Sequence, residues 1–154
     1  MSNLVAILKE IDELVNAGKI DLGLAAPTGD IAGLTAKIEA EHSGKTPAAL
    51  VELFQWHNGQ DGDLGQLPDS NQRLMSVAEA MEAWAFFLCE EEDYLEPYEK
   101  RWFPIITNDC SDYLMFDLDS GELWSYWHDD PDRFVEHPSL EVWATSLRDH
   151  IQSL

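Results

Sequence analysis

Hydrophobic residues in the first third of the chain recur every three to four positions, the period of one helix face. Residues 4–17 carry this pattern with acidic residues on the opposite face, which predicts an amphipathic helix. A second helix is expected to begin near Thr28 or Asp30. Thr46-Pro47 predicts the start of a third, with the threonine hydroxyl as N-cap and the proline at the first helical position.

The next segment passes from turn-forming residues back to a helical pattern. Residues 59–72 have no periodicity and many glycines and polar turn formers, so we expect an exposed loop, followed by a short strand at Leu74-Met75. Ser76 and Glu79 have the spacing of a capping box, in which each side chain accepts a hydrogen bond from a backbone amide at the helix start. The fourth helix then runs into the four acids of residues 90–93.

Beyond residue 100 the pattern becomes that of β-strands. Residues 102–106 predict one strand, whose proline favours a sheet edge or the beginning of a strand. Residues 113–118 and 123–127 predict a hairpin, and residues 134–136 predict a further strand. A terminal helix opens at Pro138-Ser139. Helices followed by a run of strands and one last helix predict an α+β fold with an antiparallel sheet.

The length of 154 residues falls within the usual range of one domain. We therefore expect a single domain over residues 1–154, in which residues 1–27 form an N-terminal helical extension and loop. The hydrophobic fraction of 45% is sufficient for a sizeable core, which argues against intrinsic disorder.

The composition is strongly acidic. Thirty aspartate and glutamate residues against nine lysine and arginine residues give a formal net charge of -21. Such a surface would repel nucleic acids and anionic membranes, so neither is expected as a partner. A basic protein is the partner that this charge favours.

Targeting and redox signals favour the cytoplasm. The apolar stretch at residues 4–8 has no basic region ahead of it and is interrupted by Lys9-Glu10, the opposite of a secretory signal. No apolar run approaches the ~20 residues that span a bilayer. Cys89 and Cys110 are too few for a disulfide framework. We expect a cytoplasmic protein with reduced thiols.

Motifs for catalysis or metal binding are incomplete or missing. The sequence contains no phosphate-binding loop, nucleophile elbow or H-E-x-x-H motif. Residues 117–121 begin like a calcium loop, but Gly121 and Glu122 stand where that loop needs a carboxylate or amide and then a glycine. Cys110 lies among carboxylates that blunt a thiol's reactivity. We expect no enzymatic activity, no cofactor and no metal.

Acidic residues gather in short segments, one of which follows Trp127, an aromatic residue at a strand end that could face a partner. A run of charges is usually a solvated face, but a surface kept acidic also captures basic proteins by electrostatic steering. An aromatic anchor beside it would strengthen such an interface. The candidate partner-binding residues are Asp61, Asp63, Glu90, Glu91, Glu92, Asp93, Trp127, Asp129, Asp130 and Asp132.

Ordered blocks over roughly residues 28–150 resemble the SUKH superfamily, also called the SMI/KNR family. The blocks are Thr46-Pro47 through Leu50 and Phe54 to His57-Asn58-Gly59, Leu74-Met75-Ser76 with Glu79, residues 102–105, Asp112-Tyr113-Leu114, Asp117, Gly121, His128-Asp129 and Ser139 to Trp143. Cys110-Ser111 stand where the family often has glycine, and the helix at 4–17 lies outside the similar region.

The resemblance implies a binding module with no established active site. It implies an α+β fold with a mixed sheet, so we expect a mixed, mainly antiparallel sheet of about four to six strands in the C-terminal half, packed against N-terminal helices and one C-terminal helix. Bacterial members are regarded as immunity proteins that neutralise toxins, often nucleases, and fungal members regulate cell-wall assembly.

The expected function is therefore protein binding rather than catalysis. We expect a bacterial immunity protein that neutralises a basic toxin domain, with a nuclease domain as one candidate, by stoichiometric binding. The alternative is a regulatory or scaffold domain that binds an endogenous cytoplasmic protein. The sequence does not define the oligomeric state.

Overall fold

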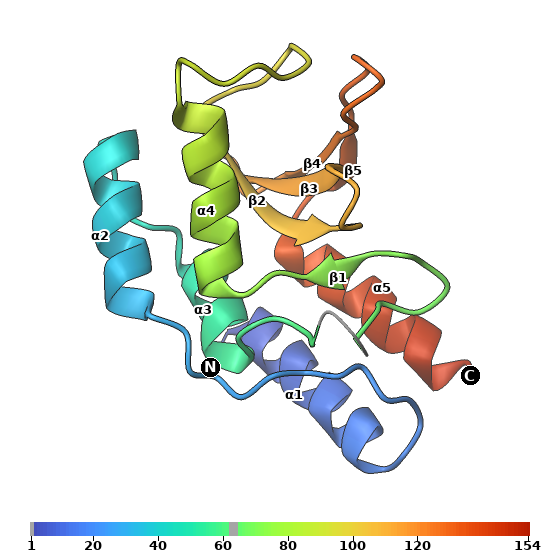
Figure 1. Cartoon of the computed structure of the whole chain (residues 1–154). Coiled ribbons are helices and arrows are strands. Elements are labelled where there is room, and N and C mark those ends of the chain that lie inside the picture. Colours follow the sequence, from blue (N-terminus) through green and yellow to red (C-terminus); the bar gives the residue numbers. More distant parts are fainter. Residues whose placement is uncertain (1, 62–64) are drawn as a thin grey trace.

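The computed structural model describes residues 2–61 and 65–154, and these form an α+β fold (Figure 1). The described helices are α1 (Asn3–Asn16), α2 (Ile31–His42), α3 (Ala48–Trp56), α4 (Val77–Leu88) and α5 (Leu140–Gln152). The strands are β1 (Arg73–Leu74), β2 (Trp102–Thr107), β3 (Tyr113–Asp117), β4 (Leu123–Tyr126) and β5 (Val135–His137). The predicted fold class is confirmed.

The five strands form one sheet in chain order, β1-β2-β3-β4-β5. Each strand is antiparallel to the next, and the mixed component implied by the resemblance is not found among the pairings of the described residues. The predicted hairpin joins β3 to β4, and Gly121 in its turn has a φ of +78°, which glycine adopts at little cost.

Pro104 lies inside β2 rather than in an edge strand. β1 pairs only Arg73 with Thr107 and Leu74 with Ile106, so it ends before it reaches the proline. The register between β2 and β3 also shifts between Pro104 and Ile106. A strand with neighbours on both sides therefore tolerates the proline, because β1 offers no ladder partner at that position.

Two predicted helix starts have different outcomes. The capping box is confirmed: the Ser76 hydroxyl accepts from the Glu79 amide at 3.1 Å, and the Glu79 carboxylate accepts from the Ser76 amide at 3.0 Å. The prediction for α3 is wrong, because Pro47 itself is the N-cap and no side chain bonds the first turn. The Thr46 hydroxyl is buried without a hydrogen-bond partner among the described residues.

The segment expected to be an exposed loop at residues 59–72 is partly buried. Gln60 is 4% exposed, and its side-chain amide donates to the Leu22 carbonyl and accepts from the Leu74 amide, each at 2.7 Å. Leu67 is also buried. A glutamine among turn formers looks solvent-exposed in sequence. Here the Gln60 side chain bonds the backbone of β1 and the backbone of the segment after α1, in place of direct backbone pairing between the two.

The main core lies between one face of the sheet and the helices. α1 packs against α3 and α5, and α4 packs against β2 (Figure 1). Although α1 lies outside the region of resemblance, its Leu4, Leu8 and Ile11 are fully part of this core. Burying each such side chain contributes about 1.5–3 kcal/mol. The N-terminal helix is therefore built into the same packing as the strands.

A second, aromatic cluster covers the opposite face of the sheet. Phe87 of α4 packs there with Trp102, Met115 and Tyr126, and Tyr98 from the segment between α4 and β2 lies over them. The rings of Phe87 and Tyr98 stack with centroids 4.5 Å apart. This connecting segment, residues 89–101, is thus a fixed cover rather than a free linker. None of the described helices combines the length and apolar composition needed to cross a bilayer.

Replacing Gly59 by alanine is expected to destabilise the fold severely. Gly59 has a φ of +77°, and an added Cβ would lie 2.6 Å from the Ser76 backbone nitrogen and 2.7 Å from the Met75 carbonyl carbon. Gly121→Ala is the matched control, because its φ of +78° is the same but no atom lies within 4 Å of its Cβ position. We expect losses of about 3 and about 1 kcal/mol respectively in urea unfolding monitored by circular dichroism. Equal losses would refute the close approach at Gly59.

Candidate functional site

A cleft of about 670 Å³ lies between α4, the turn between β2 and β3, and the two loops at one end of the sheet. Its size is typical of a site that takes a ligand or a partner side chain. Its chemistry combines carboxylates with aromatic rings. The lining side chains used below are Arg73, Glu79, Glu82, Phe86, Phe87, Asp93, Tyr94, Asp109, Tyr113, Tyr126 and His128.

Arg73 is the buried charged group of this cleft. Its guanidinium donates to both Glu79 oxygens at 3.0 and 2.6 Å, and to both Asp109 oxygens at 2.9 and 2.8 Å. Asp109 and then Glu79 raise the pKa of Arg73 far above its usual value, and the bond from Arg73 lowers the pKa of Glu79. One side chain thereby joins β1, the start of α4 and the turn between β2 and β3.

The aromatic wall of the cleft is built around Phe87. Its ring centroid lies 5.1 Å from Tyr94, 5.6 Å from Tyr113 and 5.1 Å from Tyr126, in edge-to-face arrangements. Phe86, one residue earlier on α4, is 39% exposed and has its centroid 6.2 Å from Tyr94. The wall is therefore continuous from the buried cluster to an exposed edge at Phe86.

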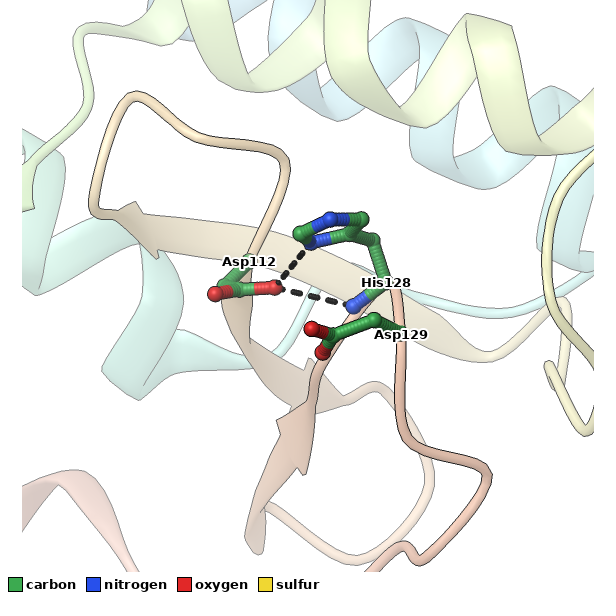
Figure 2. A group of neighbouring side chains, drawn as sticks. All are labelled: Asp112, His128 and Asp129. Atoms are coloured by element: carbon green, nitrogen blue, oxygen red, sulfur yellow. Dashed lines mark hydrogen bonds and ion pairs between the residues drawn. The ribbon is translucent and has the colours of Figure 1, made fainter.

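Asp112 and His128 form a hydrogen-bonded pair at the rim of the cleft (Figure 2). The same Asp112 oxygen accepts from the His128 backbone amide at 2.8 Å and from His128 Nδ1 at 2.7 Å. Burial alone would raise the pKa of Asp112, but hydrogen bonds from His128 and Asn108 lower it below its usual range. The carboxylate in turn raises the pKa of His128.

Asp129 lies beside this pair, so three ligand-type side chains meet within 4.8 Å (Figure 2). Imidazole and carboxylate donors of this kind suit several divalent metals. The Asp112 oxygen and His128 Nδ1 already bond each other, however, so this pair of atoms is occupied by an internal hydrogen bond. The arrangement is accounted for as a carboxylate–imidazole pair.

Asp117, in the segment that begins like a calcium loop, is occupied by the protein itself. It is 2% exposed, and one oxygen accepts from Arg101 Nε at 2.9 Å. The other accepts from the backbone amides of Asp119 and Ser120, which closes the hairpin turn. Its role in the structure is to neutralise Arg101 and to shape this turn.

The structure brings two of the predicted acidic segments together. Glu90 to Asp93 lie in the turn after α4, and Asp129, Asp130 and Asp132 lie in the loop between β4 and β5; all seven side chains are exposed. Figure 1 shows both loops projecting from the same end of the molecule. We call this surface, residues 90–93 with Asp129, Asp130 and Asp132, the acidic end.

Arg133 holds the two loops of the acidic end side by side. Its guanidinium donates to the carbonyls of Leu95 and Pro97, each at 3.0 Å, and lies 3.9 Å from the ring centroid of Tyr126. Tyr126 donates its hydroxyl to the same Leu95 carbonyl at 2.7 Å. The spacing of the acidic residues is thus set by contacts to the backbone, and Asp93 of this surface also lines the cleft.

The remaining candidates divide between this end and another part of the molecule. Trp127 is 49% exposed in the loop between β4 and β5, next to the acidic end. Asp61 lies elsewhere: its amide donates to the Gly23 carbonyl at 2.8 Å, in the segment after α1. Asp63 lies outside the described residues. The structure therefore groups Trp127 with the acidic end and does not group Asp61 with it.

Sequence reasoning missed most of the cleft. Glu79 was expected only as a capping residue, whereas it also binds Arg73. The positions of Tyr94, Tyr113 and His128 in the sequence follow no motif that would indicate a shared site. A signal was available in Arg73, because a cation in a chain with few of them is expected to bind carboxylates.

Removing the Arg73 charge is expected to destabilise the fold moderately. Arg73→Met leaves Glu79 and Asp109 facing each other without a cation, but both carboxylates are about half exposed and regain water. We expect a loss of about 2 kcal/mol in urea unfolding, with Arg73→Lys losing less because the charge remains. Unchanged stability of Arg73→Met would show that the contact does not support the fold.

The hydrogen bond between Asp112 and His128 predicts that the pKa of His128 depends on Asp112. His128 is expected to titrate above its ordinary pKa of 6.5, because Asp112 accepts its Nδ1–H. The bond therefore contributes its full stabilisation of the fold below the ordinary pKa of 6.5. That stabilisation is lost as pH rises through the raised pKa of His128 in the folded protein. Asp112→Asn should lower the pKa of His128 in an NMR titration. His137, whose pKa burial lowers, is the internal control and should not move.

Comparison with known proteins identifies the family of this fold. The model of the SMI1/KNR4 family (SUKH-1) matches residues 32–146. A comparison with curated proteins gave no match. The matched segment starts within α2, ends within α5 and contains every strand and every residue that lines the cleft. Since this match spans well over half of the 154 residues, the chain belongs to the SMI1/KNR4 family (SUKH-1).

Proposed function

We propose that this chain is a non-catalytic immunity-type protein that neutralises a basic toxin domain by stoichiometric binding. The observation that carries the proposal is the acidic end, where two loops held together by Arg133 carry seven exposed carboxylates next to an aromatic cleft. Membership of a family whose bacterial members are regarded as immunity proteins supports the same function. The proposed contacts are the acidic end and Trp127.

The position of these charges is unfavourable for the isolated fold, which supports a role in binding. Glu90 to Asp93 follow the C-terminal end of α4, where the helix dipole disfavours negative charge. Like charges on neighbouring loops also repel each other. A basic partner would relieve both costs. A toxin that cleaves nucleic acid has a basic active face, and the acidic end would occupy it in place of phosphates.

Exposed aromatic side chains beside the acidic end support a protein partner. Trp127 is 49% exposed and Phe134 is 52% exposed, and both lie between β4 and β5. Solvation alone does not require large rings on a charged surface, whereas tryptophan and other aromatics are enriched among the residues that dominate binding energy. Charge would guide the encounter and these rings would stabilise the complex.

The cysteines favour action inside the cell. Cys89 and Cys110 are both exposed and neither forms a disulfide. Exposed free thiols persist in reducing compartments, so we place the proposed complex in the cytoplasm. There the protein would protect the cell that makes the toxin.

The partner and its toxicity can be tested together. The tagged chain is used to capture proteins from its native cells, and each captured protein is expressed alone and with this chain. We expect a captured protein that stops growth when expressed alone and is harmless when this chain is present. A specific partner that is harmless on its own would overturn the immunity function and favour regulation or scaffolding.

The affinity of the complex is expected to fall with salt. Raising ionic strength from about 50 to about 500 mM should weaken binding by about tenfold or more, mainly through slower association, because screening removes the long-range attraction. The paired substitutions Glu91→Gln and Glu92→Gln should slow association at low salt. Glu13→Gln with Glu39→Gln is the control, since these exposed residues lie on α1 and α2. A salt-independent affinity would contradict electrostatic capture.

A further inference from the structure

We infer that the cleft beside the acidic end receives an arginine side chain of the partner. Four residues would hold it: Glu82, Phe86, Asp93 and Tyr94, which we call the arginine-binding strip. All four line the cleft. The inference rests on the proposed function, because it states which group of a basic protein partner enters this site.

The charges of the cleft are not balanced within the chain. Glu79 and Asp109 both form ion pairs with Arg73, so each of these two carboxylates has a cation beside it. Glu82 and Asp93 also line the cleft and are exposed, and neither side chain has an ion pair or hydrogen bond within residues 2–61 and 65–154. Two carboxylates are therefore left to attract a cation from outside.

Each of these acidic residues is close in sequence to an aromatic residue that lines the same cleft. Glu82 and Phe86 are four residues apart on α4, so they occupy the same helix face. Asp93 directly precedes Tyr94, and the Phe86 and Tyr94 ring centroids are 6.2 Å apart. The strip thus offers two flat rings and two carboxylates in one cleft. A guanidinium matches it, because that group stacks on rings and forms two parallel bonds to a carboxylate.

The chain already binds two of its own arginines by these same contacts, close to the strip. Arg133 lies 3.9 Å from the ring centroid of Tyr126, which lines the cleft. Arg73 lies between two carboxylates in the cleft. A lysine ammonium would pair with the acids as a point charge but would gain less from the rings. The chemistry of the strip therefore favours arginine over lysine.

The position of the strip favours a side chain of a protein over a free small cation. Asp93 belongs both to the strip and to the acidic end, so a partner docked on the acidic end would cover the mouth of the cleft. A volume of about 670 Å³ leaves room for an arginine and part of its chain segment. The arginine would then be a buried anchor within a larger charged interface.

The first test uses short blocked peptides as probes, Gly-Arg-Gly and Gly-Lys-Gly, with the ¹⁵N-labelled full chain. We expect the arginine peptide to shift the amide signals of Glu82, Phe86 and Tyr94, and to bind about threefold or more tightly than the lysine peptide. Equal affinities, or shifts spread over acidic surfaces such as α2, would overturn the inference.

Matched substitutions then test the strip itself. Glu82→Lys should weaken binding of the arginine peptide about tenfold, whereas Glu39→Lys, the same charge change at an exposed position of α2, should change it less than about twofold. Phe86→Ala should weaken binding, and Val142→Ala, which shortens a similarly exposed apolar side chain on α5 outside the cleft, should not. Thermal unfolding of each variant checks that the fold is kept. Equal effects of Glu82→Lys and Glu39→Lys would refute the site.

The failure of this inference is distinguishable from the failure of the proposed function. If a captured toxin is neutralised with unchanged affinity by Glu82→Lys, the arginine site is wrong and the immunity function stands. If the arginine peptide binds the strip but the captured partner is not toxic, the arginine site stands and the immunity function is wrong.

Discussion

The cleft at one end of the sheet depends on the ion pairs of Arg73 with Glu79 and Asp109. The buried guanidinium fixes the start of α4 against β1 and the turn between β2 and β3, and these are the elements between which the cleft opens. In a chain with a formal charge of -21, a buried cation also allows two carboxylates to stand close together. Arg73 binds two carboxylates that would otherwise repel each other, so their charges help to hold three elements together. The other carboxylates that line the cleft, Glu82 and Asp93, are exposed.

Local signals in the sequence predict most of the fold. The capping box at Ser76 and Glu79, the hairpin at Gly121 and the terminal helix are encoded within a few residues, so periodicity and turn chemistry identify them. Two of the errors share one cause, which is tertiary context. Gln60 looks like a loop residue until it bonds Leu22 and Leu74, and Pro104 looks like an edge residue until β1 proves too short to reach it.

The candidate site shows the same division between local and long-range information. The acidic runs were visible in sequence because charge is a property of composition, and the loop between β4 and β5 was placed by its flanking strands. Their proximity was not visible, because it depends on Arg133 bonding the carbonyls of Leu95 and Pro97 across more than thirty residues of chain. The cleft was missed for a related reason: its lining comes from five separate stretches, none of which is unusual by itself.

Two side chains from outside the cover formed by residues 89–101 hold it through its main-chain carbonyls. Tyr126 donates to the Leu95 carbonyl, and Arg133 donates to the carbonyls of Leu95 and Pro97. Because every peptide unit has a carbonyl, these anchors are indifferent to which side chains the cover carries. Substitutions at the exposed positions can therefore accumulate while the backbone keeps its course, and a lineage can change the chemistry of this surface without having to re-establish its architecture.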